Sequence, residues 1–184
     1  MRKISAYNFI SLNGSYKGLN GDISWHKHGA EENTYSEESL KHGNTLLFGR
    51  ITFEMMASFW PTPMAYGQSP VVADGMNKAE KIVFSRTLKN TKWNNSVIIK
   101  DNIADEIRKM KQTPGNDMTI LGSGTIITQF AEQNLIDEYQ FMIDPVVIQN
   151  GTSVFENINC NLNLKLTETK TFNSGVVLLR YSII

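Results

Sequence analysis

The sequence predicts one α/β domain over residues 1–184, and three observations favour this fold class. The length suits a single domain. As far as residue 135, short apolar runs that suit buried strands alternate with segments whose apolar residues recur at helical spacing. Beyond residue 135 only strand-like runs follow, so we expect alternating strands and helices first and an antiparallel β ending after them.

The start of the chain predicts a strand, a long loop and a helix. Residues 2–11, RKISAYNFIS, are apolar and β-branched with partial alternation, which is typical of a strand. Residues 13–29 are rich in glycine and polar residues, and a loop of this length is usually functional or mobile. Residues 31–42 have weak helical character.

The next segments predict a buried strand, a helix and an irregular stretch, followed by two more strands. TLLFG, residues 45–49, is short and apolar. Residues 50–59 have helical character, which ends at WPTP because proline cannot continue a helix. Residues 61–75 are expected to be irregular. Residues 80–85 and 96–100 have the composition of strands.

Two further helices are expected before the β ending. Asp101 is a candidate N-cap for a helix that ends at Pro114-Gly115. Residues 118–121 predict a strand, and the turn Gly122-Ser123-Gly124 leads into the second helix. The apolar faces of the two helices consist of Ile103, Ile107 and Met110, and of Ile126, Ile127, Phe130 and Ala131.

The last third of the chain predicts strands alone. Residues 137–148, 163–172 and 175–183 each have strand composition. FNSGV, residues 172–176, resembles the turn of a final hairpin. The two halves of the chain therefore differ in kind, and the hairpin is expected to close the sheet.

Composition excludes several classes of partner and site. Basic and acidic residues are equal at 18 each, so charge gives no reason to expect a nucleic acid or an anionic membrane surface. The single cysteine, Cys160, cannot form an internal disulfide, and no signal peptide or transmembrane segment is evident, so a cytoplasmic protein is expected. His26 and His28 have no further Cys or His nearby, so no metal site is expected.

Three predicted strand ends carry residues that suit phosphate groups. Gly122 and Gly124 let a phosphate approach a helix start, where unpaired N–H groups and the helix dipole favour an anion. Gly49 and Arg50 repeat this arrangement, and residues 85–87, Ser-Arg-Thr, follow a third strand. Because α/β sheets bind ligands beyond the carboxyl ends of their strands, we expect a ligand with several phosphates there.

The glycine turn at residues 122–124 also has other interpretations. A P-loop requires lysine and then serine or threonine after its last glycine, where Thr125 and Ile126 stand. A Rossmann fingerprint requires a third glycine where Ile127 stands. Asp144 has the spacing of the ribose-binding acidic residue, but no further βα units follow it. Taken alone, the stretch is equally consistent with a glycine turn that binds no ligand.

The order of the motifs resembles a known fold. LLFGRITFE, IVFSRTL and ILGSGTIITQF, at these spacings, resemble dihydrofolate reductase. ISLNG, DEYQFMIDPVVIQNGTSVF and GVVLLRY look more like the reductase domain of the bifunctional riboflavin-biosynthesis deaminase–reductase and its stand-alone bacterial relatives. The resemblance implies three layers, with helices on both faces of a mostly parallel mixed sheet and an antiparallel C-terminal hairpin. It also implies NADPH as cofactor and a homodimer.

The resemblance assigns most of the cofactor site by position. Ser85 and Arg86 match residues near the adenosine 2′-phosphate, which favours NADP over NAD, and Lys100 borders the adenine. The full cofactor set comprises Gly49, Arg50, Thr52, Ser85, Arg86, Thr87, Lys100, Leu121, Gly122, Ser123, Gly124, Thr125 and Ile126.

The substrate side is less specific. Reduction requires a proton source, and dihydrofolate reductases use a carboxylate in their first helix for it. Glu32 and Asp22 are the candidates here, although the helix glutamates are most simply exposed charges. Asn33 lies near the family's carboxylate position, and Trp25 can stack on a flat substrate. Asn13 replaces the aspartate of the riboflavin branch.

These observations predict an NADPH-dependent reductase that transfers hydride to a C=N or C=O bond of a small, pterin-like or pyrimidine-like substrate. Riboflavin reductases commonly carry a lysine where Ser15 stands, so their phosphoribosyl substrate is not assigned to this chain. One alternative is a nucleotide-binding or flat-ligand-binding module on the same fold without turnover. Another is a dihydrofolate reductase proper.

Overall fold

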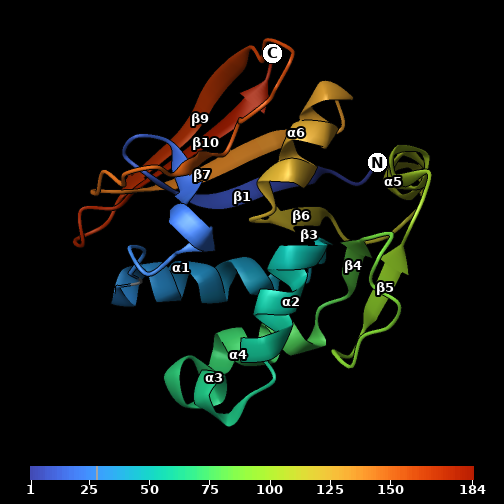
Figure 1. The fold of residues 1–184 in the computed structure, drawn as a ribbon, viewed down its shortest axis with the longest axis horizontal. Helices are drawn as coiled ribbons and strands as arrows, with labels where there is room; N and C mark the ends of the chain where they lie inside the picture. Colours follow the sequence, from blue (N-terminus) through green and yellow to red (C-terminus); the bar gives the residue numbers. More distant parts are fainter. Residues whose placement is uncertain (28) are drawn as a thin grey trace.

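A mixed sheet forms the centre of the computed structural model, which describes residues 1–27 and 29–184. Its strand order is β5-β4-β3-β6-β1-β7-β10-β9 (Figure 1). Neighbouring strands from β5 to β7 are parallel, whereas β10 is antiparallel to both β7 and β9. The strands are β1 (Ile4–Ser11), β3 (Thr45–Gly49), β4 (Lys81–Phe84), β5 (Ser96–Ile99), β6 (Met118–Leu121), β7 (Glu138–Asp144), β9 (Leu164–Thr171) and β10 (Val177–Ile183).

Helices cover both faces of this sheet (Figure 1). α5 and α6 pack on one face, and α1, α2 and α4 pack on the other. The helices are α1 (Ala30–Lys41), α2 (Arg50–Phe59), α3 (Pro63–Gln68), α4 (Pro70–Lys78), α5 (Ile103–Gln112) and α6 (Gly124–Glu132). The predicted three-layer α/β fold with an antiparallel C-terminal hairpin is thereby confirmed.

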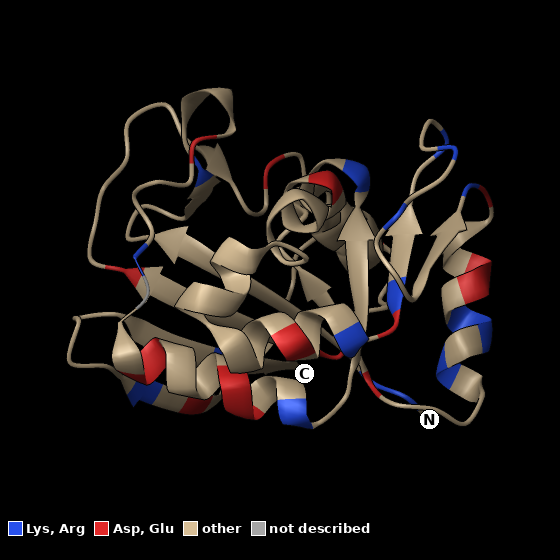
Figure 2. Cartoon of the chain, turned by 90° about the horizontal axis from the view of Figure 1, so that it is seen from below, with Lys and Arg blue, Asp and Glu red and all other residues tan. Residues whose placement is uncertain are grey.

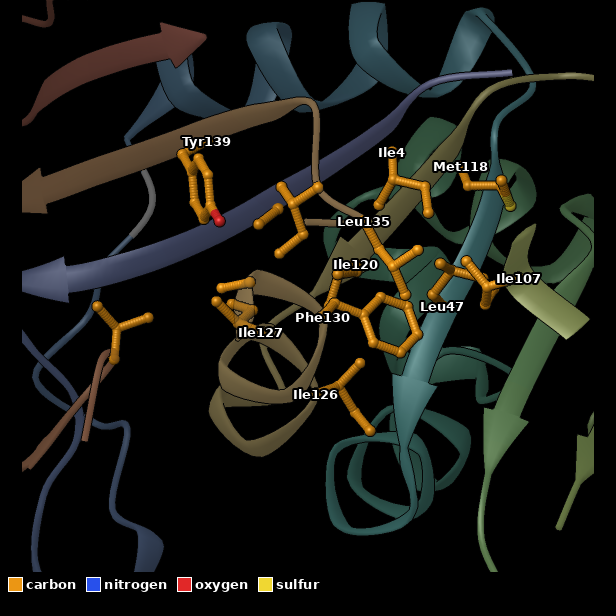
Figure 3. Packing of buried hydrophobic residues seen from close by; sticks show 14 of the residues in the cluster. Ile4, Leu47, Ile107, Met118, Ile120, Ile126, Ile127, Phe130, Leu135 and Tyr139 are labelled. Atoms are coloured by element: carbon orange, nitrogen blue, oxygen red, sulfur yellow. The ribbon is translucent and has the colours of Figure 1, made fainter. Parts of the chain in front are cut away.

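The two-faced burial of β3 explains its uninterrupted apolar sequence. Successive side chains of a strand point to opposite faces of the sheet. Leu47 belongs to the core under α5 and α6, while Leu46 and Phe48 belong to the core under α2 and α4. Figure 3 shows Phe130 of α6 in the first of these cores, near Leu47. A parallel strand buried on both sides requires apolar residues throughout.

The irregular stretch predicted for residues 61–75 is wrong, because α3 and α4 begin there. Pro63 and Pro70 each occupy the first turn of a helix, and the Thr62 side chain caps α3 by accepting from the Ala65 N–H. Proline is favoured at this position because its fixed φ is helical and the missing N–H has no partner there. Proline also ends helices, which is why this stretch was expected to be irregular.

Three smaller features also differ from expectation. Asp101 does not cap α5, since Asn102 precedes the helix with a left-handed φ of 53° and Asp101 accepts from Arg86 Nε. The strand expected to reach residue 148 ends at Asp144, because Pro145 cannot donate to a strand ladder. The loop over residues 13–29 contains a 3₁₀ turn (Leu19–Gly21) and β2 (Ser15–Lys17), which pairs with β8 (Thr152–Ser153).

Charged residues of both signs are interspersed along the helices that flank the sheet (Figure 2). Within the described part of the chain, no helix is both long enough and apolar enough to span a membrane. The surface of the fold therefore matches the equal numbers of acidic and basic residues in the sequence.

A buried lysine closes the C-terminal end of α4. Lys81 has 0% relative exposure, and its Nζ donates to three carbonyl oxygens, those of Met76, Asn77 and Ala79, at 2.9, 3.1 and 2.7 Å. The same ammonium lies 4.6 Å from the centroid of the Trp93 ring. We expect Lys81→Met to lower the free energy of unfolding by about 2 kcal/mol, because it removes the shared donor from these three carbonyl oxygens.

Denaturant titration at several pH values tests this role. Burial lowers the pKa of Lys81 from 10.5 to about 8, so the unfolded chain binds more protons than the folded chain between these two values. The free energy of unfolding of the wild-type protein should therefore include a contribution that rises with pH across that interval, and Lys81→Met should lack this contribution. Exposed Lys78→Met is the control, with a change within about 0.5 kcal/mol. Equal stability of the two variants would contradict the assignment.

Candidate active site

A cavity of about 1620 Å³ opens along the carboxyl ends of the parallel strands. It is lined by residues at or just beyond the ends of β3, β4, β5 and β6, among them Gly49, Ser85, Lys100 and Gly122. Pockets for one small ligand usually measure about 300–1,000 Å³, so this cavity has room for two ligands side by side. Every residue predicted to hold the cofactor lines it except Thr87, whose N–H donates to Ser85 Oγ at 3.2 Å.

Ser123 joins two of the predicted phosphate-binding segments. It precedes α6 with a left-handed φ of 58°, and Gly122 before it has the same positive φ. The Ser123 hydroxyl accepts from the Gly49 N–H at 2.9 Å and donates to the Leu121 carbonyl at 3.3 Å. The end of β3 and the turn after β6 are thus held beside each other, which the sequence predicted only through resemblance.

Glycines are required where these segments meet. A Cβ on Gly49 would lie 3.3 Å from Ile126 Cγ1, and one on Gly122 would lie 3.3 Å from Thr52 Cγ2. A Cβ on Gly124 would lie 2.8 Å from the Tyr16 ring. Neither α2 nor α6 has a side-chain cap, although the Ile126 N–H already donates to the Ser123 carbonyl at 2.8 Å. The remaining first-turn N–H groups lie at the positive end of each helix, where they favour an anion. These features fit the diphosphate of a dinucleotide.

The cationic residues beside this turn are held only by weak ion pairs. Arg50 Nη1 lies 2.8 Å from Glu54, and Arg86 Nε lies 3.1 Å from Asp101, and all four side chains are more than 40% exposed. Exposed pairs contribute about 0–1 kcal/mol, so either arginine can turn to a phosphate at small cost. Their position in the cavity lining agrees with the predicted role.

The predicted substrate residues separate into two groups. Trp25 and Asn33 line the cavity. Asn13 does not, because its side chain accepts from Ser11 Oγ and exchanges hydrogen bonds with the backbone of Ile148. Asn13 therefore fixes the loop after β1 to the loop after β7.

Neither of the carboxylates predicted to serve catalysis lines the cavity. Glu32 is 1% exposed and accepts from Ser174 Oγ, so the expectation of an exposed helix charge is wrong. Glu32 ties α1 to the turn between β9 and β10. Asp22 is exposed, and its carboxylate accepts from the Ser24 N–H at 2.9 Å, which lowers its pKa below the usual value.

A buried histidine–aspartate pair lies at the substrate end instead. His26 Nδ1 is 2.9 and 3.0 Å from the two carboxylate oxygens of Asp144, and the side chains are 12% and 5% exposed. The His26 ring stacks on Phe9 with centroids 3.9 Å apart and lines the cavity. The sequence analysis missed this pair because its members are 118 positions apart.

Of the two histidines considered as metal ligands, only His26 can be placed, because His28 lies outside the described residues. Among the residues that are described, no group of three or more His, Cys, Asp or Glu side chains is arranged to hold a metal ion. His26 is engaged with the Asp144 carboxylate.

A polar floor lies beneath α1. Gln140 of β7 is paired in register with Tyr7 of β1 on one side and Arg180 of β10 on the other. The Tyr35 hydroxyl of α1 accepts from Arg180 Nη2 at 3.1 Å and donates to Gln140 Oε1 at 3.3 Å. Glu168 lies 2.9 Å from Arg180 Nη1 and offsets its charge. This end of the cavity suits a polar molecule without a strong charge.

The family model described as the RibD C-terminal domain matches residues 2–178. The chain belongs to the RibD C-terminal domain family. One relative is YyaP of Bacillus subtilis strain 168. It is 32% identical over 172 residues, which cover 94% of this chain and 90% of YyaP. YwjB of the same organism is 25% identical over 179 residues, covering 96% of each chain. The predicted membership of the riboflavin-reductase branch is confirmed.

Solved structures agree with this RibD C-terminal-type fold. A putative riboflavin biosynthesis protein from Shewanella sp. PV-4 has a TM-score of 0.77 at 17% identity, covering 99% of both chains. Dihydrofolate reductase from Enterococcus faecalis, complexed with NADP(H), has a TM-score of 0.68 at 16% identity, covering 98% of this chain and 96% of that one. At these identities the likeness establishes the fold.

Proposed function

We propose that this RibD C-terminal-type protein is an NADPH-dependent reductase of a small heterocyclic compound with a C=N or C=O bond. The observation that carries the proposal is the convergence of Gly49, Arg86 and the turn at residues 122–124 on one cavity. Family membership supports it, because the enzymes of this fold named above include a dihydrofolate reductase that binds NADP(H).

The chain's own residues divide the work of binding. The first-turn N–H groups of α2 and α6 receive the diphosphate, and Arg50 neutralises part of its charge. Arg86 and Ser85 lie at the end of the cavity that suits a 2′-phosphate. When bound, NADPH supplies the hydride.

The substrate occupies the end beneath α1. Its wall includes Trp25, and its floor includes Tyr7 and Gln140. An aromatic wall and neutral hydrogen-bonding groups suit a flat heterocycle with amide-like edges, such as a pterin or a pyrimidine. The charge of Arg180 is already offset by Glu168, so a strongly anionic substrate is not favoured at this depth.

The test is oxidation of NADPH, followed by its absorbance, with dihydrofolate, 7,8-dihydrobiopterin, aminouracils, flavins and small carbonyl compounds as acceptors. We expect turnover with at least one heterocycle. Tight NADPH binding without turnover of any acceptor would instead favour a binding module on this fold. That alternative has its own support, since neither Glu32 nor Asp22 lines the cavity. Turnover of dihydrofolate above all other acceptors would identify a dihydrofolate reductase.

A further inference from the structure

The reduction needs a proton at the substrate end of the cavity, and few groups there can give one. Tyr7 lines this region, but burial raises the pKa of its hydroxyl far above the usual value, so it is a poor acid. Glu38 and His42 also line the cavity, at exposed positions of and after α1. Tyr35 is also buried there, but its hydroxyl proton is donated to Gln140, so His26, held by Asp144, is the stronger candidate.

We infer that His26, held by Asp144, donates the proton that completes the reduction. This inference rests on the proposed function and deepens it. The carboxylate engages Nδ1, so in this scheme the transferred proton is carried by Nε2, an atom that is buried in this structure. This is the division of roles that a histidine acid and an orienting aspartate have in other enzymes. Asp144 is a positioning residue in this scheme.

The transfer of hydride and proton conserves atoms and electrons. The carbon of the C=N or C=O bond receives the hydride, and the π electron pair of that bond moves to its nitrogen or oxygen. The His26 Nε2–H bond breaks, and its proton forms the new N–H or O–H bond. The imidazolium becomes neutral imidazole, which regains a proton from solvent before the next turnover.

The surroundings of the pair fix the orientation of the imidazole ring. Phe9 stacks on one face of the ring, and Trp25 packs edge-on with centroids 5.9 Å apart. The titratable groups around it are Asp144 on β7, Tyr7 on β1, and Glu32 and Tyr35 on α1. Burial raises the pKa of Tyr7 most, and the nearby Tyr35, Asp144 and Glu32 raise it further. A low-exposure setting strengthens the attraction between ring and carboxylate.

The segment that carries His26 is positioned by its own hydrogen bonds. The Trp25 Nε1–H donates to the Asp22 carbonyl at 3.2 Å, and the His26 N–H donates to the Ile23 carbonyl at 3.1 Å. These contacts form a turn that directs the ring to β1 and β7. Asp22 therefore contributes through its backbone and through a local turn, which is a different role from the predicted catalytic carboxylate.

Nitrogen-15 NMR of the imidazole rings gives a readout that needs no substrate. The chain has only three histidines, so His26→Asn assigns the signal directly. In the wild-type protein we expect the neutral His26 ring to carry its proton on Nδ1, facing Asp144. In Asp144→Asn the amide can donate to Nδ1, so the proton should move to Nε2. A wild-type ring with its neutral-form proton on Nε2 would overturn the inference.

Kinetics with the fastest acceptor of the screen gives the second readout. We expect His26→Asn and His26→Gln to lower the turnover number by about 10²-fold or more, with NADPH affinity retained. The residual rate should lose the fall at high pH that an essential acid gives the wild type. Asp105→Asn, at an exposed position of α5 outside this cavity, is the control and should keep that fall.

The two proposals fail differently in this experiment. A wild-type protein that neither binds NADPH nor oxidises it with any acceptor contradicts the proposed function itself. A wild-type protein that does both, while the His26 and Asp144 variants keep its rate and pH profile, contradicts only the role of the pair.

Discussion

Gly124→Val is expected to weaken NADPH binding by about ten- to a hundredfold. Gly124 is the first residue of α6, and even a Cβ there would lie 2.8 Å from the Tyr16 ring. Two further methyl groups would crowd the first-turn N–H groups that are proposed to receive the diphosphate. Overpacking of this kind costs about 1–3 kcal/mol, and each 1.4 kcal/mol is a factor of ten in affinity.

Fluorescence titration of NADPH measures this loss. Gly67→Val is the matched control, because a Cβ on Gly67 in α3 meets nothing within 4 Å and Gly67 is not a lining residue of the cavity. That variant should bind NADPH like the wild type. Unchanged affinity in a folded Gly124→Val protein would mean that no ligand group rests on the start of α6.

Arg86→Ala is expected to weaken NADPH binding by about tenfold and to leave NADH binding nearly unchanged. Arg86 is 82% exposed and lies at the cavity end beyond β4, where its partner Asp101 holds it only weakly. A charge-assisted hydrogen bond to a phosphate contributes about 1.5–3 kcal/mol, and exposure favours the lower end of this interval. NADH lacks the 2′-phosphate that would receive this bond.

Titration of both nucleotides with Arg86→Ala and with Arg108→Ala separates a local from a general charge effect. Arg108 is an exposed residue of α5, paired with Asp105 outside the cavity. Arg108→Ala should change neither affinity. Equal losses of NADPH and NADH in Arg86→Ala would remove this side chain from the 2′-phosphate.

Much of the fold could be predicted because buried strands and helices have apolar residues at regular spacings in the sequence. β3, buried on both faces, is an apolar run, and α6 has its apolar residues on one face. The segment around α3 and α4 was mispredicted because proline both ends and begins helices, and only Thr62 marks which of the two applies here. The end of β7 at Asp144 depended in the same way on the proline that follows.

The cofactor end of the cavity could be predicted because its residues are contiguous in short motifs at strand ends. The glycines at positions 49, 122 and 124 converge through one Ser123 hydrogen bond, which no motif encodes. The substrate end could not be predicted, because it is assembled from distant strands and loops. His26 meets Asp144 only after β1 and β7 have paired, and Glu32 turns to the β9–β10 hairpin.

Three expectations stay predictions. The homodimer, the cytoplasmic location and the assignment of residues 1–184 to one domain belong to this group. Size-exclusion chromatography with light scattering would measure the oligomeric state directly.

The central claim is that the cavity is built for NADPH, and its most direct test is calorimetric titration of the wild-type protein with NADPH and with NADH. We predict that NADPH binds at micromolar concentration and that NADH binds about tenfold more weakly, because only NADPH carries the 2′-phosphate that we propose Arg86 and Ser85 contact. Absence of NADPH binding at millimolar concentration, or equal affinity for the two nucleotides, would contradict the claim.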